Sequence, residues 1–283
     1  MNLREDVKKE LLVAAHRGAA GGIIPCNTLA SYDAAIAEGA EIVEIDVTRA
    51  KDGTLFAFHP HMEAAHLNSA CEIPELTARE VKKLRYVTSD RVPTEYGVST
   101  LGEVFQHLKG RCYINIDKLE TDIGGIAQAV REYHIQDQVI AKTWADQELF
   151  KQVEKYAPDL PYMVMMREKD VWTEHLKDLR LNYLGAEVMF SSEESPLAQK
   201  EYVEKMHAMG YYVWCNAIVF NPEVVFAAGH SDEISAVGFP EEGWGWLADR
   251  GYDMMQTDWA GAAVRYLKSS GKKYRHCEEW ERC

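Results

Sequence analysis

Short apolar runs rich in β-branched and aromatic residues alternate with longer stretches of periodic apolar positions along the whole chain. Runs of four to eight such residues are typical of buried strands, whereas apolar positions spaced three and four apart favour helices. By this criterion we expect strands at residues 11–16, 42–47, 55–58, 112–117, 138–143, 162–166, 183–190, 211–216 and 252–257. The same pattern predicts helices at residues 28–38, 77–84, 100–108, 123–133, 145–156, 196–209, 223–228 and 261–269. Asn27 and Thr28 precede the first helix as capping residues, and Gly39 ends it.

The order of these elements predicts a parallel α/β barrel of the TIM (β/α)8 type. The run at 55–58 does not fit the alternation, because only the turn Lys51-Asp52-Gly53-Thr54 separates it from the run at 42–47. A parallel neighbour would need a longer crossover, so 55–58 is interpreted as an accessory hairpin strand. Residues 61–99 have mixed character and are expected to form a small insertion beside the mouth of the barrel. With no linker or repeat in the sequence, residues 1–283 are expected to form a single domain.

The composition narrows the classes of partner. With 283 residues, of which 47% are hydrophobic, the chain can bury a large core. Its formal net charge of −14 argues against nucleic acid or an anionic membrane surface as the main partner. A small anionic substrate is compatible with this charge, provided that a metal ion or a few placed cations receive it. The sequence leaves the oligomeric state open.

The cysteines and the N-terminus bear on the cellular compartment. The six cysteines include no C-x-x-C pair, which argues against zinc ribbons and redox motifs and favours reduced thiols in a cytoplasmic protein. The first 18 residues carry charges of both signs, and their apolar run at 11–15 is too short for a signal peptide. No run approaches the roughly 18 apolar residues of a membrane-spanning helix. We therefore expect a cytoplasmic protein without a transmembrane segment, secreted only if a leader has been removed.

Two acidic residues interrupt the apolar run at 42–47. Glu44 and Asp46 are two positions apart, so on a strand their carboxylates point to the same side. A hard cation between them would offset their repulsion and the cost of burying them, and oxygen ligands favour Mg²⁺ or Ca²⁺. The hairpin strand then delivers His59 to the same region. The alternative interpretation is a solvated face of an antiparallel sheet, followed by a structural histidine.

Polar or aromatic residues follow most of the other expected strands. In a TIM barrel the carboxyl ends of the strands meet at one rim, where the active site lies. The residues at or just after the strand ends are His16, Arg17, Glu44, Asp46, Asp117, Lys142, Trp214, Asn216, Asp258 and Trp259. The barrel interpretation therefore predicts that these side chains gather around one opening.

Several motifs follow one another in a characteristic order. The first sixty residues contain Ala15-His16-Arg17-Gly18, Asn27-Thr28, Gly39-Ala40-x-x-Val43-Glu44-x-Asp46-Val47, Lys51-Asp52-Gly53-Thr54 and His59. Later motifs are Asn115-Ile116-Asp117, Val213-Trp214-x-Asn216 and Gln256-Thr257-Asp258. In order and spacing they resemble the signature of the glycerophosphodiester phosphodiesterases, within the superfamily of phospholipase C-like phosphodiesterases. The resemblance extends over essentially the whole chain in the order of its elements.

The resemblance implies a barrel phosphodiesterase in which Glu44, Asp46 and Asp117 hold a divalent cation. It also implies that His16 and His59 transfer the protons of the reaction. Histidine suits this task because its ordinary pKa lies near neutrality. We expect His16 to act as the base and His59 as the acid, and the sequence is compatible with either order.

Other rim residues are candidates for binding the substrate. The planar guanidinium of Arg17 suits a phosphate. Lys118 and Lys142 are candidate phosphate ligands or plain surface lysines. On a strand Lys118 would face away from the preceding acid, so a phosphate role for it requires a bend. Trp214 and Trp259 either line a pocket for the alcohol part of the substrate or cap the core.

The chain departs from the family pattern at several positions. Cys26 stands where the family usually has Glu before Asn-Thr, so one contact to the metal or the phosphate is missing or replaced. Pro60 follows His59 where Asp is common, and Asp117 stands where Glu is more usual. His61, with His59, also resembles the paired metal ligands of amidohydrolases, although the rest of that pattern is absent.

The leading hypothesis is the metal-dependent hydrolysis of glycerophosphodiesters to glycerol phosphate and an alcohol, an activity of glycerol and lipid metabolism. One alternative is a phospholipase C-like or D-like reaction on a lipid or lysolipid, which would require an apolar opening. Another is a non-catalytic protein that keeps the metal and phosphate sites. The presence of both His16 and His59 argues against it, because a binding protein needs no proton carriers.

Overall fold

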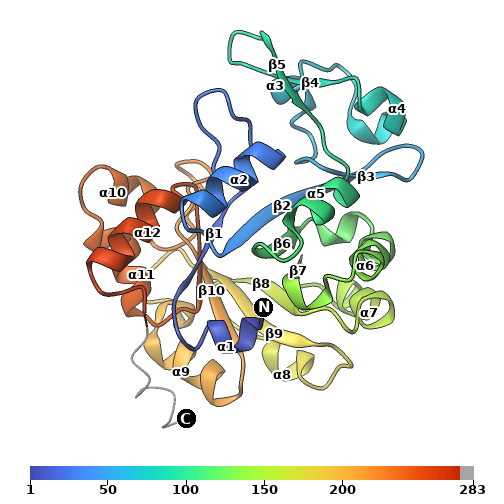
Figure 1. Ribbon diagram of the computed structural model, residues 1–283. Helices are drawn as coiled ribbons and strands as arrows, with labels where there is room; N and C mark the ends of the chain where they lie inside the picture. Colours follow the sequence, from blue (N-terminus) through green and yellow to red (C-terminus); the bar gives the residue numbers. More distant parts are fainter. Residues whose placement is uncertain (275–283) are drawn as a thin grey trace.

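A closed barrel forms the centre of the computed structural model, which describes residues 1–274 (Figure 1). Its strands are β1 (Leu12–Ala15), β2 (Ile42–Arg49), β6 (Tyr113–Asp117), β7 (Val139–Trp144), β8 (Tyr162–Arg167), β9 (Tyr183–Met189), β10 (Tyr212–Asn216) and β11 (Met254–Thr257). They pair in this order, each pair is parallel, and β11 pairs with β1 to close the ring. The prediction of a TIM barrel is confirmed.

An additional strand extends β2 beyond the barrel. β3 (Leu55–Ala57) pairs antiparallel with the end of β2, as the Asp-Gly turn predicted. Gly53 in this turn has a φ of +91°, a conformation that glycine adopts without the steric cost of a Cβ atom. The hairpin brings Phe58 into the core and leads directly to His59.

Helices surround the barrel (Figure 1). The longer ones are α2 (Leu29–Ala37), α5 (Leu101–Leu108), α6 (Ile123–Glu132), α7 (Gln147–Tyr156), α9 (Lys200–Ala208) and α12 (Ala260–Ser269), and the short ones include α1 (Leu3–Asp6), α8 (Thr173–Leu176), α10 (Asp232–Ala236) and α11 (Trp246–Asp249). Thr28 is the N-cap of α2, because its hydroxyl accepts a hydrogen bond from the backbone N–H of Ser31. Gly39 follows this helix with a φ of +96°, which agrees with its expected role. Within residues 1–274, no helix is both long and apolar enough to cross a membrane.

Three of the expected helices differ from the structure. Residues 223–228 form no helix, because Ala227 bridges to Phe190 at the end of β9 and the backbone N–H of Ala228 donates to the Phe190 carbonyl. The expected helix at 77–84 is only the short α4 (Ala78–Val81). The one at 196–209 is divided into η4 (Pro196–Ala198) and α9, since Gln199 between them is extended.

The barrel interior is filled from its amino end. Alternate strand residues, among them Leu12, Ile42 and Met163, form one buried cluster together with Leu3 of α1. Trp214 belongs to this cluster and is fully buried. Because these apolar side chains fill the amino-terminal part of the barrel, the polar side chains that face inward lie at its carboxyl end.

Residues 61–99 form an excursion that projects from one side of the barrel (Figure 1). It contains α3 (Glu63–His66), η1 (Ile73–Glu75), α4, β4 (Arg85–Val87) and β5 (Pro93–Gly97). Its apolar side chains, such as Leu67, Val81 and Tyr86, share one buried cluster with Phe56 and Phe58 of the hairpin. The excursion is therefore attached to the barrel through the segment that carries His59.

Candidate active site

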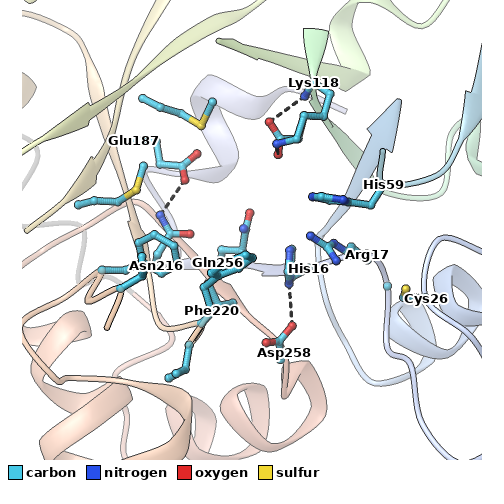
Figure 2. Close-up of a pocket in the computed structure, with 18 of the residues that line it drawn as sticks. His16, Arg17, Cys26, His59, Lys118, Glu187, Asn216, Phe220, Gln256 and Asp258 are labelled. Atoms are coloured by element: carbon cyan, nitrogen blue, oxygen red, sulfur yellow. Dashed lines mark hydrogen bonds and ion pairs between the residues drawn. The ribbon is translucent and has the colours of Figure 1, made fainter. Parts of the chain in front are cut away.

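A cavity of about 780 Å³ opens at the carboxyl end of the barrel. This volume lies in the range of small-molecule sites. Figure 2 shows the cavity, and its wall includes His16, Arg17, Cys26, His59, Asp117, Lys118, Trp144, Met165, Arg167, Glu187, Met189, Asn216, Val219, Phe220, Phe226, Gln256, Asp258 and Trp259. We call it the mouth cavity.

Three carboxylates from neighbouring strands meet beside the mouth cavity. Asp46 of β2 is in register with Asp117 of β6, and Glu44 lies one inward-facing position below Asp46. One oxygen atom from each of the three lies within 4.8 Å of the others. The structure thus brings together the acids that the sequence proposed as metal ligands.

The cluster fits a hard divalent cation. Glu44 Oε1 and Asp46 Oδ1 are buried and have no hydrogen-bond partner within residues 1–274. Oxygen atoms this close are compatible with a shared Mg²⁺ or Ca²⁺, whose oxygen ligands lie roughly 2.0–2.6 Å from the ion. Burial, followed by the charge of Asp46, raises the pKa of Glu44 to about 8. A bound cation would remove the repulsion that keeps a proton on this carboxyl group.

Two residues outside the strands orient Asp46. The guanidinium Nε of Arg17 lies 2.9 Å from Asp46 Oδ2, and the amide Nδ2 of Asn27 donates to the same oxygen at 2.8 Å. Both contacts engage Oδ2 and leave Oδ1 free. The expectation that Asn27 caps α2 is therefore wrong, since Thr28 alone is the N-cap and Asn27, at a φ of +55°, turns toward the acids.

His16 is paired with an acid. Its Nδ1 lies 2.7 Å from Asp258 Oδ1, and Figure 2 shows its ring directed into the cavity. Burial opposes the charged imidazolium, but the hydrogen bond with Asp258 and the charge of Glu44 outweigh burial and raise the pKa of His16. The protonated form is thus favoured here.

His59 has a different environment. Its Nδ1 lies 2.8 Å from the carbonyl oxygen of Pro60, which only accepts hydrogen bonds, so Nδ1 carries the proton. Its Nε2 faces the acidic cluster, 4.0 Å from Asp46 Oδ1. Burial lowers the pKa of His59, and the nearby charge of Arg17 acts in the same direction against the attraction of Asp46. The neutral form is thus favoured, with a lone pair on Nε2.

Lys118 has the bend that a role at the rim requires. It adopts the left-handed conformation, with a φ of 59°, directly after β6. Its Nζ then turns back and lies 2.8 Å from Asp117 Oδ2. Lys118 therefore lines the mouth cavity instead of facing away from Asp117.

Lys142 and Trp214 lie deeper than the sequence suggested. Lys142 is buried in an ion pair with Glu187, and its Nζ lies 3.2 Å from the centre of the Trp214 ring. Neither residue belongs to the wall of the mouth cavity. Their burial favours the core role that the sequence left open for Trp214, and it shows that Lys142 is not a surface lysine. Lys142 pairs with Glu187, and Trp214 contacts Lys142. Trp259, in contrast, lines the cavity and is half exposed.

Sequence reasoning missed Glu187, which lines the cavity and has Lys142 and Asn216 as its partners. One of its oxygens is paired with Lys142. The other accepts from Asn216 Nδ2 at 2.7 Å, as Figure 2 shows. An acid inside the apolar run at 183–190 is the same signal that revealed Glu44, and it was available for Glu187 too. The paired Asn216 was already expected at the rim.

Two of the residues that depart from the family pattern, Cys26 and His61, contribute no carboxylate or imidazole to the acidic cluster. Cys26 lies at the cavity with its Sγ 3.7 Å from His66 Nδ1, and burial raises its pKa to about 11. The thiol is therefore neutral and adds no fourth carboxylate. His61 lies on the exposed excursion, where its Nδ1 is 2.9 Å from Glu72, so it does not join the acidic cluster.

Fold and site together define a class: a (β/α)8 barrel with an acidic cluster and two histidines at its carboxyl mouth. The family model described as the glycerophosphoryl diester phosphodiesterase family matches residues 16–216, and the chain belongs to this family.

Relatives with curated descriptions support the assignment. The glycerophosphodiester phosphodiesterase of Caldanaerobacter subterraneus is 29% identical over 163 residues, which is 53% of this chain and 64% of that protein. The glycerophosphodiester phosphodiesterase GDPD4 of Arabidopsis thaliana is 33% identical over 91 residues, or 29% of this chain and 27% of that protein. The chain thus matches less than two thirds of the length of these relatives.

Solved structures share the fold over nearly the whole chain. A glycerophosphoryl diester phosphodiesterase from Parabacteroides distasonis has a TM-score of 0.75 at 17% identity, covering 95% of this chain and 93% of that one. A phosphodiesterase from Oleispira antarctica, in complex with the product sn-glycerol-3-phosphate, has a TM-score of 0.69 at 20% identity, covering 95% of this chain and 100% of that one.

Proposed function

We propose that the protein hydrolyses glycerophosphodiesters to glycerol phosphate and an alcohol with the help of a divalent cation, Mg²⁺ or Ca²⁺. The observation that carries this proposal is that the cluster of Glu44, Asp46 and Asp117 lies beside the cavity that His16 and His59 line. Membership of the glycerophosphoryl diester phosphodiesterase family supports it. So does the product, sn-glycerol-3-phosphate, in the Oleispira antarctica relative.

The phosphate would bind between the acidic cluster and two cationic side chains. Glu44, Asp46 and Asp117 would hold the cation, which would supply Lewis acidity toward a phosphate oxygen. Arg17 and Lys118 both line the cavity, where Arg17 contacts Asp46 and Lys118 contacts Asp117. Their positive charges would stabilise the negative charge that grows on the phosphate oxygens as the diester reacts.

The two histidines would divide the proton transfers. His59 presents an unprotonated Nε2, so it takes the proton from the attacking hydroxyl, which belongs to water or to the 2-hydroxyl of the glycerol. His16, whose protonated form is stabilised by Asp258, gives a proton to the leaving alkoxide. These hydrogen bonds favour the reverse of the order expected from the sequence.

The floor of the cavity suits a substrate with hydroxyl groups. Asn216 Oδ1 and Gln256 Oε1 are buried at the cavity and have no hydrogen-bond partner within residues 1–274. A buried acceptor without a partner is costly, and a hydroxyl group of the substrate would satisfy it. Glycerophosphodiesters carry such hydroxyls on their glycerol part, whereas a diester such as bis-p-nitrophenyl phosphate has none.

A lysophospholipid is the second candidate substrate. Val219, Phe220 and Trp259 line the cavity, and they are 38%, 65% and 50% exposed. Exposed apolar side chains at an opening are the feature that an acyl chain would require. This apolar rim distinguishes the lysolipid hypothesis from the simple glycerophosphodiester one.

The test is an assay of phosphodiester hydrolysis that measures release of the alcohol. Glycerophosphocholine, glycerophosphoethanolamine, glycerophosphoinositol and lysophosphatidylcholine are incubated with Mg²⁺, Ca²⁺, Mn²⁺ or EDTA, with bis-p-nitrophenyl phosphate as a diester that lacks hydroxyls. We expect turnover of the glycerol esters with a cation and none in EDTA. Turnover that persists in EDTA would exclude the cation role, and turnover of lysophosphatidylcholine alone would favour the second candidate. A protein that binds these esters without cleaving them would be the non-catalytic alternative.

A further inference from the structure

Arg167 ends β8 and lines the mouth cavity. Its guanidinium carbon lies 5.5 Å from the ring centre of Trp144 and 5.3 Å from that of Phe226. Both distances are typical of cation–π contacts, which orient a guanidinium through its flat faces. The N–H groups at its edge are thereby left for a planar anion. Phe226 is itself tied to the barrel, because its carbonyl accepts from the backbone N–H of Phe190 at 2.8 Å.

Arg167 differs from the other charged residues of the cavity in having no charged partner. Arg17 pairs with Asp46, and Lys118 with Asp117. The remaining acids of the wall are also paired: Glu187 with Lys142, and Asp258 with His16. Within residues 1–274, the guanidinium of Arg167 makes no hydrogen bond or ion pair. Arg167 is exposed at the cavity wall, and in a chain with a net charge of −14 a cation without an acidic partner at this place is suited to an anionic group of a ligand.

The position of Arg167 separates it from the proposed reaction centre. In the ring of eight strands, β8 is four steps from β1, so Arg167 lies across the mouth from His16. The same cavity touches both residues, and a single ligand can therefore reach from one to the other. A diester whose phosphate lies at the acidic cluster would extend its organic part toward this opposite wall.

We propose that Arg167, in contact with Trp144 and Phe226, binds a carboxylate on the alcohol part of the substrate, so that the preferred glycerophosphodiesters are those of a carboxylate-bearing alcohol such as serine. This inference rests on the proposed function. The planar fork of a guanidinium matches the two oxygens of a carboxylate. One guanidinium balances the single charge of a carboxylate, whereas a second phosphate group would bring nearly two charges at neutral pH. The same cation repels the quaternary ammonium of a choline ester.

The test uses two pairs of compounds that differ by one carboxylate. O-phosphoserine and O-phosphoethanolamine are titrated calorimetrically into the full-length protein with Mg²⁺ or Ca²⁺, so that binding is measured without turnover. Glycerophosphoserine and glycerophosphoethanolamine are compared by kcat/KM. The variants are Arg167→Gln and, as a control, Arg265→Gln, which changes an exposed arginine on the outer helix α12. Thermal unfolding verifies that each variant is folded.

We expect phosphoserine to bind about fivefold more tightly than phosphoethanolamine, because an ion pair with an exposed arginine contributes up to about this factor. In Arg167→Gln the ratio should fall to about one, and in Arg265→Gln it should keep the wild-type value. Equal dissociation constants in the wild type, a preference that survives Arg167→Gln, or no binding of either monoester would overturn the assignment. A binding preference without turnover of either diester would instead overturn the proposed function and leave the role of Arg167 intact.

Discussion

The Nδ1 atom of His16 lies 2.7 Å from a carboxylate oxygen of Asp258, a residue 242 positions later in the chain. The two residues follow Ala15 and Thr257, which are partners in the β1–β11 pairing that closes the barrel. Asp258 is held in turn by buried Asp232, whose Oδ2 accepts from the Asp258 backbone N–H at 2.7 Å. Closure of the barrel therefore creates the pair that sets the protonation of His16.

The first prediction concerns Asp258→Asn. If His16 is the acid, activity is lost as pH rises through its raised pKa. Removing the carboxylate lowers that pKa, so the alkaline limb of the kcat/KM profile should move to lower pH by about one unit, given the partial exposure of Asp258. The acidic limb, assigned to His59, should stay in place. If His16 were the base, the acidic limb would move instead, so a pH profile distinguishes the two orders.

The second prediction concerns cation affinity. Because the pKa of Glu44 is raised to about 8, a cation must displace a proton from Glu44 at neutral pH. Affinity should therefore fall roughly tenfold per pH unit below that value, with about one proton released per ion bound. Calorimetry in buffers of different ionisation enthalpy measures both quantities. In Glu44→Gln, affinity should be weaker and the proton release lost, and unchanged binding would exclude Glu44 as a ligand.

The third prediction separates catalysis from folding. His16→Ala and His59→Ala should each lower kcat by about 10²- to 10⁴-fold, since each removes one proton transfer. Both side chains are at the cavity, so unfolding temperatures should change little. His61→Ala is the matched control, because His61 lies on the exposed excursion and should retain wild-type turnover. Near-normal rates in either cavity variant would refute the assignment of the proton carriers.

The fourth prediction concerns stability. In Lys142→Met the carboxylate of Glu187 would be left in the barrel interior without its cation, and removal of one partner from a buried ion pair costs about 3–5 kcal/mol. The double variant Lys142→Met/Glu187→Gln should recover most of this loss, since it buries no unpaired charge. Chemical denaturation measures both free energies of unfolding. A cost in the single variant of less than about 1 kcal/mol, the range of exposed ion pairs, would mean that the pair is solvated.

Much of the fold could be read from local patterns. The alternation of strands and helices predicted the barrel, and the Asp-Gly turn predicted the hairpin, because short-range geometry decides both. The spacing of Glu44 and Asp46 likewise placed their carboxylates on one face. Local patterns failed where a distant partner intervened: residues 223–228 are not helical because Ala227 is paired with Phe190.

The sequence alone determined which chemical groups the site contains. The residue types at strand ends, and the alternation of side chains between the two faces of each strand, are local properties. Only the tertiary structure decided how deeply each side chain is buried, which residues it contacts and which way it points. Lys142 reaches Glu187 below the cavity, Lys118 turns back through a left-handed residue, and His16 meets Asp258 at the closure of the barrel. These contacts depend on the register between strands and on ring closure, and neither is encoded within any single segment of the chain.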